Sequence, residues 1–286
     1  MTDSASGKQS AALTSLLAAV GLTAFKIVVG VSTGSLGILA EAAHSGLDLI
    51  AAGLTFLAVR FSGRPADSTH LYGHGKIENL SALAETLLLL LTCAWILWES
   101  VHRLRTHDTR VEVTIWSLVV MLTSIAIDVS RSRVLARAAK KYRSQALEAD
   151  ALHFQTDVWS SALVIAGLLA VKLGLWWGDA VAALGVSAVV VGVSVRLGRR
   201  TVDELLDRAP EGMEQRIAAA VSAVVGVHNC HQVRLRYSGP VLFIDLHVLV
   251  DGGQTLTEAH RLTETIEAAI REIAPDADVT VHPEPL

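Results

Sequence analysis

The sequence predicts a membrane domain of six helices followed by a small two-layer α+β domain. Hydrophobic residues make up 51% of the 286 residues, and the mean hydropathy of +0.46 is too high for an ordinary soluble domain. Apolar runs of the ~20 residues that cross a bilayer follow one another up to about residue 200. Beyond Thr201 they give way to shorter segments, some of which alternate with the period of a strand.

The elements are expected in the following order. Residues 1–9 are polar and are expected to be disordered. The membrane domain is expected to cover residues 10–207, with spans near 10–32, 35–60, 77–101, 113–134, 149–173 and 179–197. The second domain covers 208–286, with a helix at 213–225, strands at 231–237 and 241–250, a helix at 255–273 and a strand at 278–282.

Charge and cysteine usage exclude several classes of protein. The net charge of −4 gives no indication of nucleic-acid binding, and Cys93 and Cys230 form no spacing motif. The N-terminus lacks the pattern of a signal peptide, so membrane insertion depends on the helices themselves. Basic residues lie near the N-terminus, at Lys8, and at 62–76, and they gather at 131–143 and 196–200. An even number of spans puts all of these on one side, which predicts cytoplasmic N- and C-termini.

Two apolar helices each carry a histidine and an aspartate four residues apart. His44 and Asp48 lie on the second predicted span, and His153 and Asp157 lie on the fifth. A spacing of four puts both side chains of a pair on one helix face. Together the pairs offer two nitrogens and two carboxylates, a tetrahedral ligand set that suits Zn²⁺. The alternative, that each residue only hydrogen-bonds between helices, suits one such residue better than a repeated pair.

Two further groups of histidines lie outside the predicted spans. In the loop after the second span, Asp67, His70 and His74 can converge on one cation, or the histidines can merely hydrogen-bond; the spacing does not decide. In the second domain, His247 and His282 alternate with core residues and so face away from the core. His231 has the parity of core residues, which weakens its candidacy unless the strand is frayed there. The candidate ligands of this domain are His231, His247, His260, His282 and Glu284.

Four segments together resemble the cation diffusion facilitator family over nearly the whole chain. They are Leu39-Ala40-Glu41-Ala42-Ala43-His44-Ser45, Tyr72-Gly73-His74-Gly75-Lys76 with Glu78, His153-x-x-x-Asp157, and Leu205-Leu206-Asp207. The resemblance implies a homodimeric secondary transporter with six spans and a ferredoxin-like cytoplasmic domain, which exchanges a cytoplasmic divalent cation for external protons.

The resemblance also assigns roles to the candidate residues. It implies that the transport site consists of His44, Asp48, His153 and Asp157, and that a second metal site consists of Asp67, His70 and His74. It further implies a binuclear site between two cytoplasmic domains, formed by His231, His247, His260, His282 and Glu284. Lys76 and Asp207 are expected to form an interdomain salt bridge. Two departures stand out: Glu284 replaces the usual aspartate, and no histidine-rich insertion follows the fourth span. The latter indicates a bacterial protein of the inner membrane.

The sequence therefore predicts a proton-coupled exporter of Zn²⁺, with Fe²⁺, Cd²⁺ or Co²⁺ as alternative substrates. Neutral imidazole and ionised carboxylate bind metal, so protons and metal compete for the same atoms. A metal-gated channel and a metal sensor are alternatives that flux measurements distinguish. An intramembrane metalloenzyme is disfavoured, because His-Glu-x-x-His is absent and four protein ligands leave no open position. No enzymatic activity and no catalytic cofactor are expected.

Overall fold

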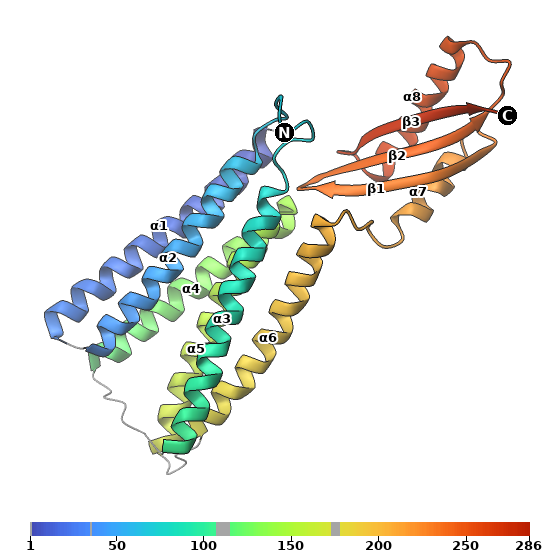
Figure 1. Ribbon diagram of the computed structural model, residues 1–286. Helices are drawn as coiled ribbons and strands as arrows, with labels where there is room; N and C mark the ends of the chain where they lie inside the picture. Colours follow the sequence, from blue (N-terminus) through green and yellow to red (C-terminus); the bar gives the residue numbers. More distant parts are fainter. Residues whose placement is uncertain (1, 35, 107–114, 173–177) are drawn as a thin grey trace. The chain divides into compact units, whose positions relative to one another are not determined.

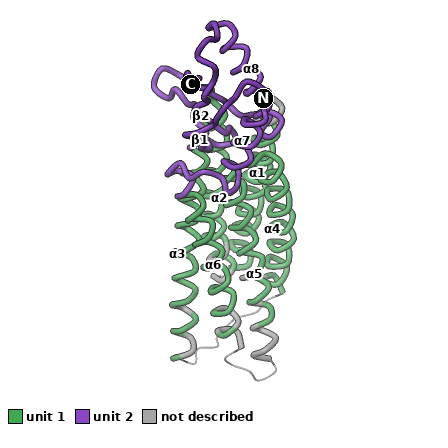
Figure 2. The backbone as a smooth tube through the Cα atoms, turned by 90° about the vertical axis from the view of Figure 1, so that its right-hand side faces the viewer, with its two compact units in different colours: residues 1–64, 77–201 green, residues 65–76, 202–286 purple. Residues whose placement is uncertain are grey.

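The structure is a computed structural model that describes residues 2–34, 36–106, 115–172 and 178–286 (Figure 1). Contacts divide the chain into two compact units (Figure 2). Unit 1 comprises residues 1–64 and 77–201, and unit 2 comprises residues 65–76 and 202–286. The division differs from the expected boundary at residue 207, because the loop 65–76 packs with the terminal residues and unit 1 ends at Thr201.

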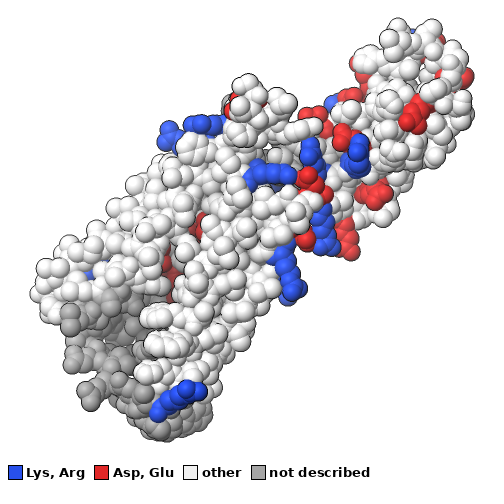
Figure 3. All heavy atoms as spheres, viewed as in Figure 1, with Lys and Arg blue, Asp and Glu red and all other residues white. Residues whose placement is uncertain are grey.

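Long helices make up unit 1. In the described residues they are α1 (Thr2–Thr33), α2 (Leu36–Ser62), α3 (Ile77–Thr106), α4 (Ile115–Tyr142), α5 (Gln145–Lys172) and α6 (Gly178–Leu205). Three stretches of the described part, Ser6–Thr33, Ala42–Ser62 and Ile77–His102, are long and apolar enough by themselves to cross a membrane. Helix α4 continues through the basic stretch that begins at Arg131 and ends at Tyr142, since this stretch contains no proline or glycine. On the face shown in Figure 3, charged side chains are sparse along the middle of this unit.

The prediction that residues 1–9 are disordered is wrong for residues 2–9, which are the first turns of α1. Lys8 is buried, and its Nζ lies 2.5 Å from Oε1 of Glu78 on α3. The ring of Tyr142 lies against Gly7, with its hydroxyl where a Cβ would stand. Gly7 and Lys8 are therefore held by contacts with residues distant in sequence, which a local pattern does not reveal.

Small side chains bring the helices of unit 1 together. The core between α1, α2, α4 and α5 consists largely of buried alanines, such as Ala12, Ala52 and Ala151, around the fully buried ring of Phe154. Small residues at helix contacts allow close backbone approach, which is how helices associate in lipid. This close contact between α2 and α5 is what positions the pairs of histidine and aspartate.

Unit 2 has the predicted order αββαβ. Its elements are α7 (Met213–Ser222), β1 (Asn229–Ser238), β2 (Val241–Val250), α8 (Leu256–Ile273) and β3 (Asp278–Pro285). The sheet has the order β1-β2-β3, with β1 and β2 antiparallel and β2 and β3 parallel. One face of the sheet, including Ile244 and Leu246, packs against Ile217 of α7 and Ile266 of α8. The other face carries the side chains that alternate with the core.

The segment 65–76 belongs to unit 2 because it packs on the β1–β2 hairpin. A Cβ on Gly75 would lie 2.5 Å from the carbonyl oxygen of Ser238, so only glycine permits this approach. The Tyr72 ring meets the Phe243 ring edge-on, with centroids 5.2 Å apart. The Arg236 guanidinium lies 4.3 Å from the centroid of the Tyr72 ring, at cation–π distance. The segment 65–76, called the histidine loop below, is thus fixed to the sheet.

Candidate metal sites

The four intramembrane residues lie together where α2 meets α5. Nε2 of His153 lies 3.1 Å from Oδ1 of Asp48 and 3.7 Å from Oδ2 of Asp157. Nε2 of His44 lies 4.0 Å from Oδ1 of Asp48 and 3.9 Å from Oδ1 of Asp157. Ligands held about 2.1 Å from a tetrahedral Zn²⁺ lie roughly 3.4 Å apart. The observed separations therefore suit a cation between the helices with little movement.

Burial and hydrogen bonding also fit a cation at this point. Asp48 and His153 are buried, and ligand atoms of Asp48, His153 and Asp157 all lie within 4.8 Å of one another. Oδ2 of Asp157 is buried without a hydrogen-bond partner among the described residues, and so is Nδ1 of His153. Buried polar atoms are rarely left unpaired, so an unpaired carboxylate oxygen facing an imidazole is expected where a ligand completes the group. The side chain of His44 is the most accessible of the four, at 36% exposed.

The loop triad is also assembled. Asp67 is within 3.4 Å of Nδ1 of His70 and 3.3 Å of Nε2 of His74, through different carboxylate oxygens. The His70 backbone N–H donates to Asp67 over 2.7 Å, and Thr69 donates through its N–H and hydroxyl. These hydrogen bonds hold the pKa of the Asp67 carboxyl well below its usual range. The hydrogen bond from the His70 backbone N–H has the largest effect. The carboxylate is therefore ionised at neutral pH and can bind a cation.

The terminal cluster is built by strand register. His231, His247 and His282 are direct neighbours across β1, β2 and β3. Glu284 accepts from Nδ1 of His247 at 2.8 Å, and its other oxygen lies 3.2 Å from Nε2 of His231. The hydrogen bond from His247 lowers the pKa of the Glu284 carboxyl, with the neighbouring histidines adding to the effect. Glutamate at position 284 thus reaches both histidines.

The parity problem of His231 is solved by a β-bulge. The register pairs His231 with His247 and Arg234 with Asp245. Between these two pairs, β1 has one more residue than β2. Gln232 has a φ of 50°, in the left-handed region. The extra residue turns His231 away from the core face, toward His247. Simple alternation, which placed His231 on the core face, fails at this point.

Two predicted terminal residues stand apart from the core of this cluster. His282 lies 3.8 Å from Oε1 of Glu284 through its Nε2, at the edge of the group. His260 lies on α8, one of the helices that cover the opposite face of the sheet, and its Nε2 is 3.9 Å from Oε1 of Glu264. Within one chain, His260 is therefore not brought to the cluster. Its role at a site shared between two copies stays a prediction.

Lys76 and Asp207 form an ion pair within unit 2. Nζ of Lys76 lies 2.7 Å from Oδ1 of Asp207, and Arg236 approaches the other carboxylate oxygen at 3.5 Å. The hydrogen bond from Lys76 is the main cause of a lowered pKa for the Asp207 carboxyl. The pair joins the histidine loop to the residues that follow α6.

Several buried charged residues near the intramembrane site were not predicted. Glu85 and Asp150 are fully buried, and each has one carboxylate oxygen without a hydrogen-bond partner in the described residues. Asp128 and Arg131 are buried too, 3.4 Å apart, and the Arg131 guanidinium lies 3.4 Å from the centroid of the Phe154 ring. A charge inside an apolar helix signals each of them, and Asp150 precedes His153 by three residues.

A bundle of membrane helices with an internal histidine–carboxylate site, joined to a small domain carrying a second such cluster, defines a class of membrane proteins that handle metal cations. Comparison with known families agrees. Residues 12–206 match the cation efflux transmembrane domain, and residues 209–286 match the cation efflux protein cytoplasmic domain. The chain therefore belongs to the cation diffusion facilitator family, whose members are cation efflux transporters and not enzymes.

Similar curated proteins cover nearly the whole chain. The cation-efflux pump FieF of Serratia proteamaculans is 36% identical over 280 residues, spanning 97% of this chain and 92% of that protein. FieF of Cronobacter sakazakii is 34% identical over 276 residues, spanning 96% and 92% respectively. Among solved structures, one titled MamM-CTD 215-293 is 28% identical in sequence to this chain, with a TM-score of 0.25. The match covers 27% of this chain and 98% of that structure's chain.

Proposed function

We propose that this protein exports a divalent transition-metal cation, Zn²⁺ foremost, across the bacterial inner membrane in exchange for protons. The observation that carries the proposal is the convergence of Asp48, His153 and Asp157 on one point between α2 and α5, with His44 beside them. Two imidazoles and two carboxylates favour Zn²⁺ over Mn²⁺ or Mg²⁺, which prefer oxygen ligands. Fe²⁺, Cd²⁺ and Co²⁺ are the alternative substrates for the same site.

Proton coupling follows from the chemistry of these ligands. Histidine binds metal only as neutral imidazole and aspartate only as carboxylate, so each ligand that takes a proton is lost to the metal. Unperturbed imidazole titrates near pH 6.5, which places this competition in the physiological range. In an alternating-access cycle, metal loads from the neutral cytoplasm and protons from the more acidic outside displace it. The proton-loaded site then returns inward and releases protons before the next metal binds.

The orientation and assembly complete the proposal. Basic residues cluster at the ends of α2, α4 and α6, which supports cytoplasmic N- and C-termini by the positive-inside rule. The match of residues 209–286 to the cytoplasmic domain of cation efflux proteins supports the same side for unit 2. We infer a homodimer in which metal at the terminal cluster joins two cytoplasmic domains. The ligands on β2 and β3 reach solvent, with side-chain exposures of 22% for His247 and 62% for His282, as a shared site requires.

Metal uptake into proteoliposomes tests the transport proposal. Purified protein is reconstituted with an imposed pH gradient, and uptake of Zn²⁺, Fe²⁺, Cd²⁺ and Co²⁺ is followed together with internal pH. Antiport predicts uptake that reverses with the gradient and proton movement in the opposite direction. Metal current without proton exchange indicates a channel, and unchanged vesicle metal content indicates a sensor; either result rejects the proposal.

We further propose that metal at the terminal cluster, by joining two cytoplasmic domains, biases the membrane helices and so regulates transport. This regulatory role has its own test. The double variant His247→Ala with His282→Ala should abolish the metal dependence of dimer stability. It should also reduce the metal dependence of the transport rate. The matched control is His228→Ala, outside the cluster in the same unit. Unchanged metal dependence of both dimer stability and rate would reject the role of this cluster without affecting the transport proposal.

A further inference from the structure

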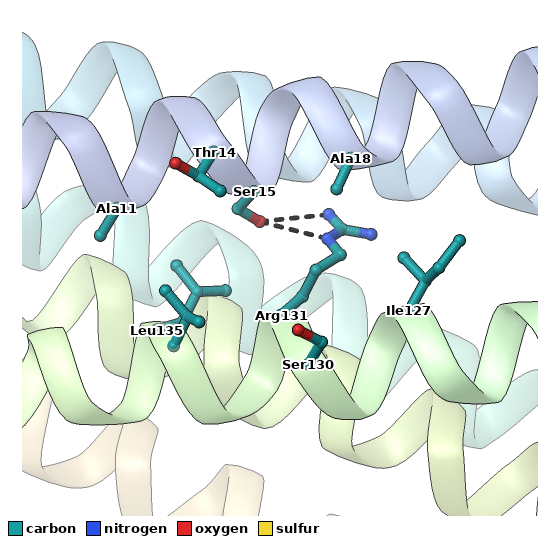
Figure 4. A pocket seen from close by; sticks show the side chains of 9 residues that line it. Ala11, Thr14, Ser15, Ala18, Ile127, Ser130, Arg131 and Leu135 are labelled. Atoms are coloured by element: carbon teal, nitrogen blue, oxygen red, sulfur yellow. Dashed lines mark hydrogen bonds between the residues drawn. The ribbon is translucent and has the colours of Figure 1, made fainter.

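A groove of about 250 Å³ lies between α1 and α4 (Figure 4). Its walls are apolar and small, with Ala11 and Ala18 from α1 and Ile127 and Val134 from α4. Val134 is 40% exposed, so the groove opens on the outer surface of unit 1. An apolar, open groove on a membrane helix pair suits an acyl chain rather than a polar solute.

A basic ridge continues one wall of this groove. Ser130 and Val134 line the groove, and Arg137 and Lys141 follow them on α4 at spacings of three and four, which keeps all four on one helix face. Arg137 and Lys141 are both exposed, and neither forms an ion pair with a described carboxylate. Two other basic residues near helix ends have acidic partners, Lys8 with Glu78 and Arg200 with Glu148. The ridge therefore presents unbalanced positive charge.

The length of α4 allows the ridge to lie at the depth of lipid headgroups. Arg137 lies 22 residues after the first residue of α4, or roughly 33 Å along the axis at ~1.5 Å per residue. The hydrocarbon core of a bilayer is ~30 Å thick, so Arg137 and Lys141 extend beyond it when the groove is inside it. In the orientation proposed above, this end faces the cytoplasm.

We propose that an anionic phospholipid occupies this groove, with an acyl chain against Ala11, Ala18 and Val134 and its phosphate between Arg137 and Lys141. Charge complementarity selects this occupant, since basic pockets between membrane helices on the cytoplasmic side suit anionic headgroups. The groove floor reaches the transport helix, because Arg131 donates to Ser15 of α1 and stacks on Phe154, the neighbour of His153. A lipid in the groove thus braces α1 and α4 against α5. The proposal rests on the orientation above and not on the identity of the transported ion.

Native mass spectrometry of the full-length protein tests lipid retention directly, with phosphatidylglycerol and phosphatidylcholine as probes. We expect preferential retention of phosphatidylglycerol, weakened roughly thirtyfold by Arg137→Gln with Lys141→Gln, from the contribution of two basic residues at the membrane surface. The control pair Arg196→Gln with Arg199→Gln makes the same charge change at exposed positions of α6 and should alter retention less than twofold. Ala18→Phe, which fills the groove, should reduce retention without changing charge.

Three results would overturn the proposal. The first is equal retention of both lipids by the unaltered protein. The second is equal loss in the ridge variant and the α6 control, which would show a general surface charge effect. The third is a change from dimer to monomer mass in the ridge or groove variants with lipid retention intact, which would assign the groove to a second copy of the chain. None of these readouts depends on transport, so they are separable from failure of the transport proposal.

Discussion

Nε2 of His153 on α5 lies 3.1 Å from Oδ1 of Asp48 on α2, across the contact between two helices that are 105 residues apart in sequence at this point. The pair shows how the site is made. Each helix supplies one histidine and one aspartate on a single face, and alanine-rich packing brings the faces together. Because the site belongs to neither helix alone, a relative movement of α2 and α5 changes the distances between the two pairs of candidate ligands.

Asp48→Asn should reduce proton-driven Zn²⁺ uptake by roughly 10- to 100-fold or more, the range found even for residues that only support a metal ligand. The substitution keeps the shape of the side chain but removes the negative charge that balances a dication. The control is Glu148→Gln, which neutralises an exposed carboxylate on α5, and flux in proteoliposomes is the measurement. Equal flux in the Asp48 variant and the control would show that these residues do not form the transport site.

The geometry of this site could be predicted because a helix has a fixed period. A spacing of four puts His44 beside Asp48 whatever else the chain does, and the same holds for His153 and Asp157. The contacts of Lys8 could not be predicted in this way. Its partner Glu78 is 70 residues away, and polar composition near a terminus ordinarily means disorder.

Lys8→Met should destabilise the protein by about 3–5 kcal/mol, because it leaves the buried Glu78 carboxylate without its cation. Glu78 retains hydrogen bonds from Ser62 and Ser144, which do not balance the charge. Adding Glu78→Gln removes the charge and should recover much of the loss. Thermal unfolding in detergent measures both. A double variant no more stable than Lys8→Met would show that the ion pair is not what fixes the start of α1.

Asp207→Asn should weaken unit 2 by less than ~1 kcal/mol, since the Asp207 side chain is 41% exposed and solvent screens its ion pair with Lys76. Asparagine tolerates the left-handed φ of 60° at this position, so the change isolates the charge. The folded-state pKa of Asp207 is lowered, so its contribution is present above the unfolded pKa of about 3.9 and is lost as pH falls through the folded value.

The effect of Asp207→Asn on the unfolding temperature should therefore be the same at pH 7 and pH 5, and should shrink below pH 4. It should also shrink in 1 M salt. Asp203→Asn, which neutralises a neighbouring carboxylate paired with Arg208, is the control. An effect that grows between pH 7 and pH 5 would contradict the claim that Lys76 lowers the pKa of the Asp207 carboxyl.

The terminal cluster marks the limit of pattern analysis. His247 could be placed on the outer face by alternation, and the structure puts it there. His231 could not, because a bulge adds one residue and reverses the parity of the strand end. A bulge depends on the partner strand, so β1 alone gives little sign of it; Gln232 is not a residue that favours a positive φ.

Deleting Gln232 should leave His231 in the terminal cluster. The deletion removes the extra residue of the bulge, and strict alternation then puts His231, two residues before Arg234, on the outer face opposite His247. Zn²⁺ affinity is measured in a background of Asp48→Asn and Asp67→Asn, which disables the other two candidate sites. The deletion should bind like the unaltered chain, as should Gln232→Gly, which keeps the bulge and relieves its φ, whereas His231→Ala should weaken binding. A deletion that weakens binding as much as His231→Ala would mean that pairing with His247 is not what places this side chain.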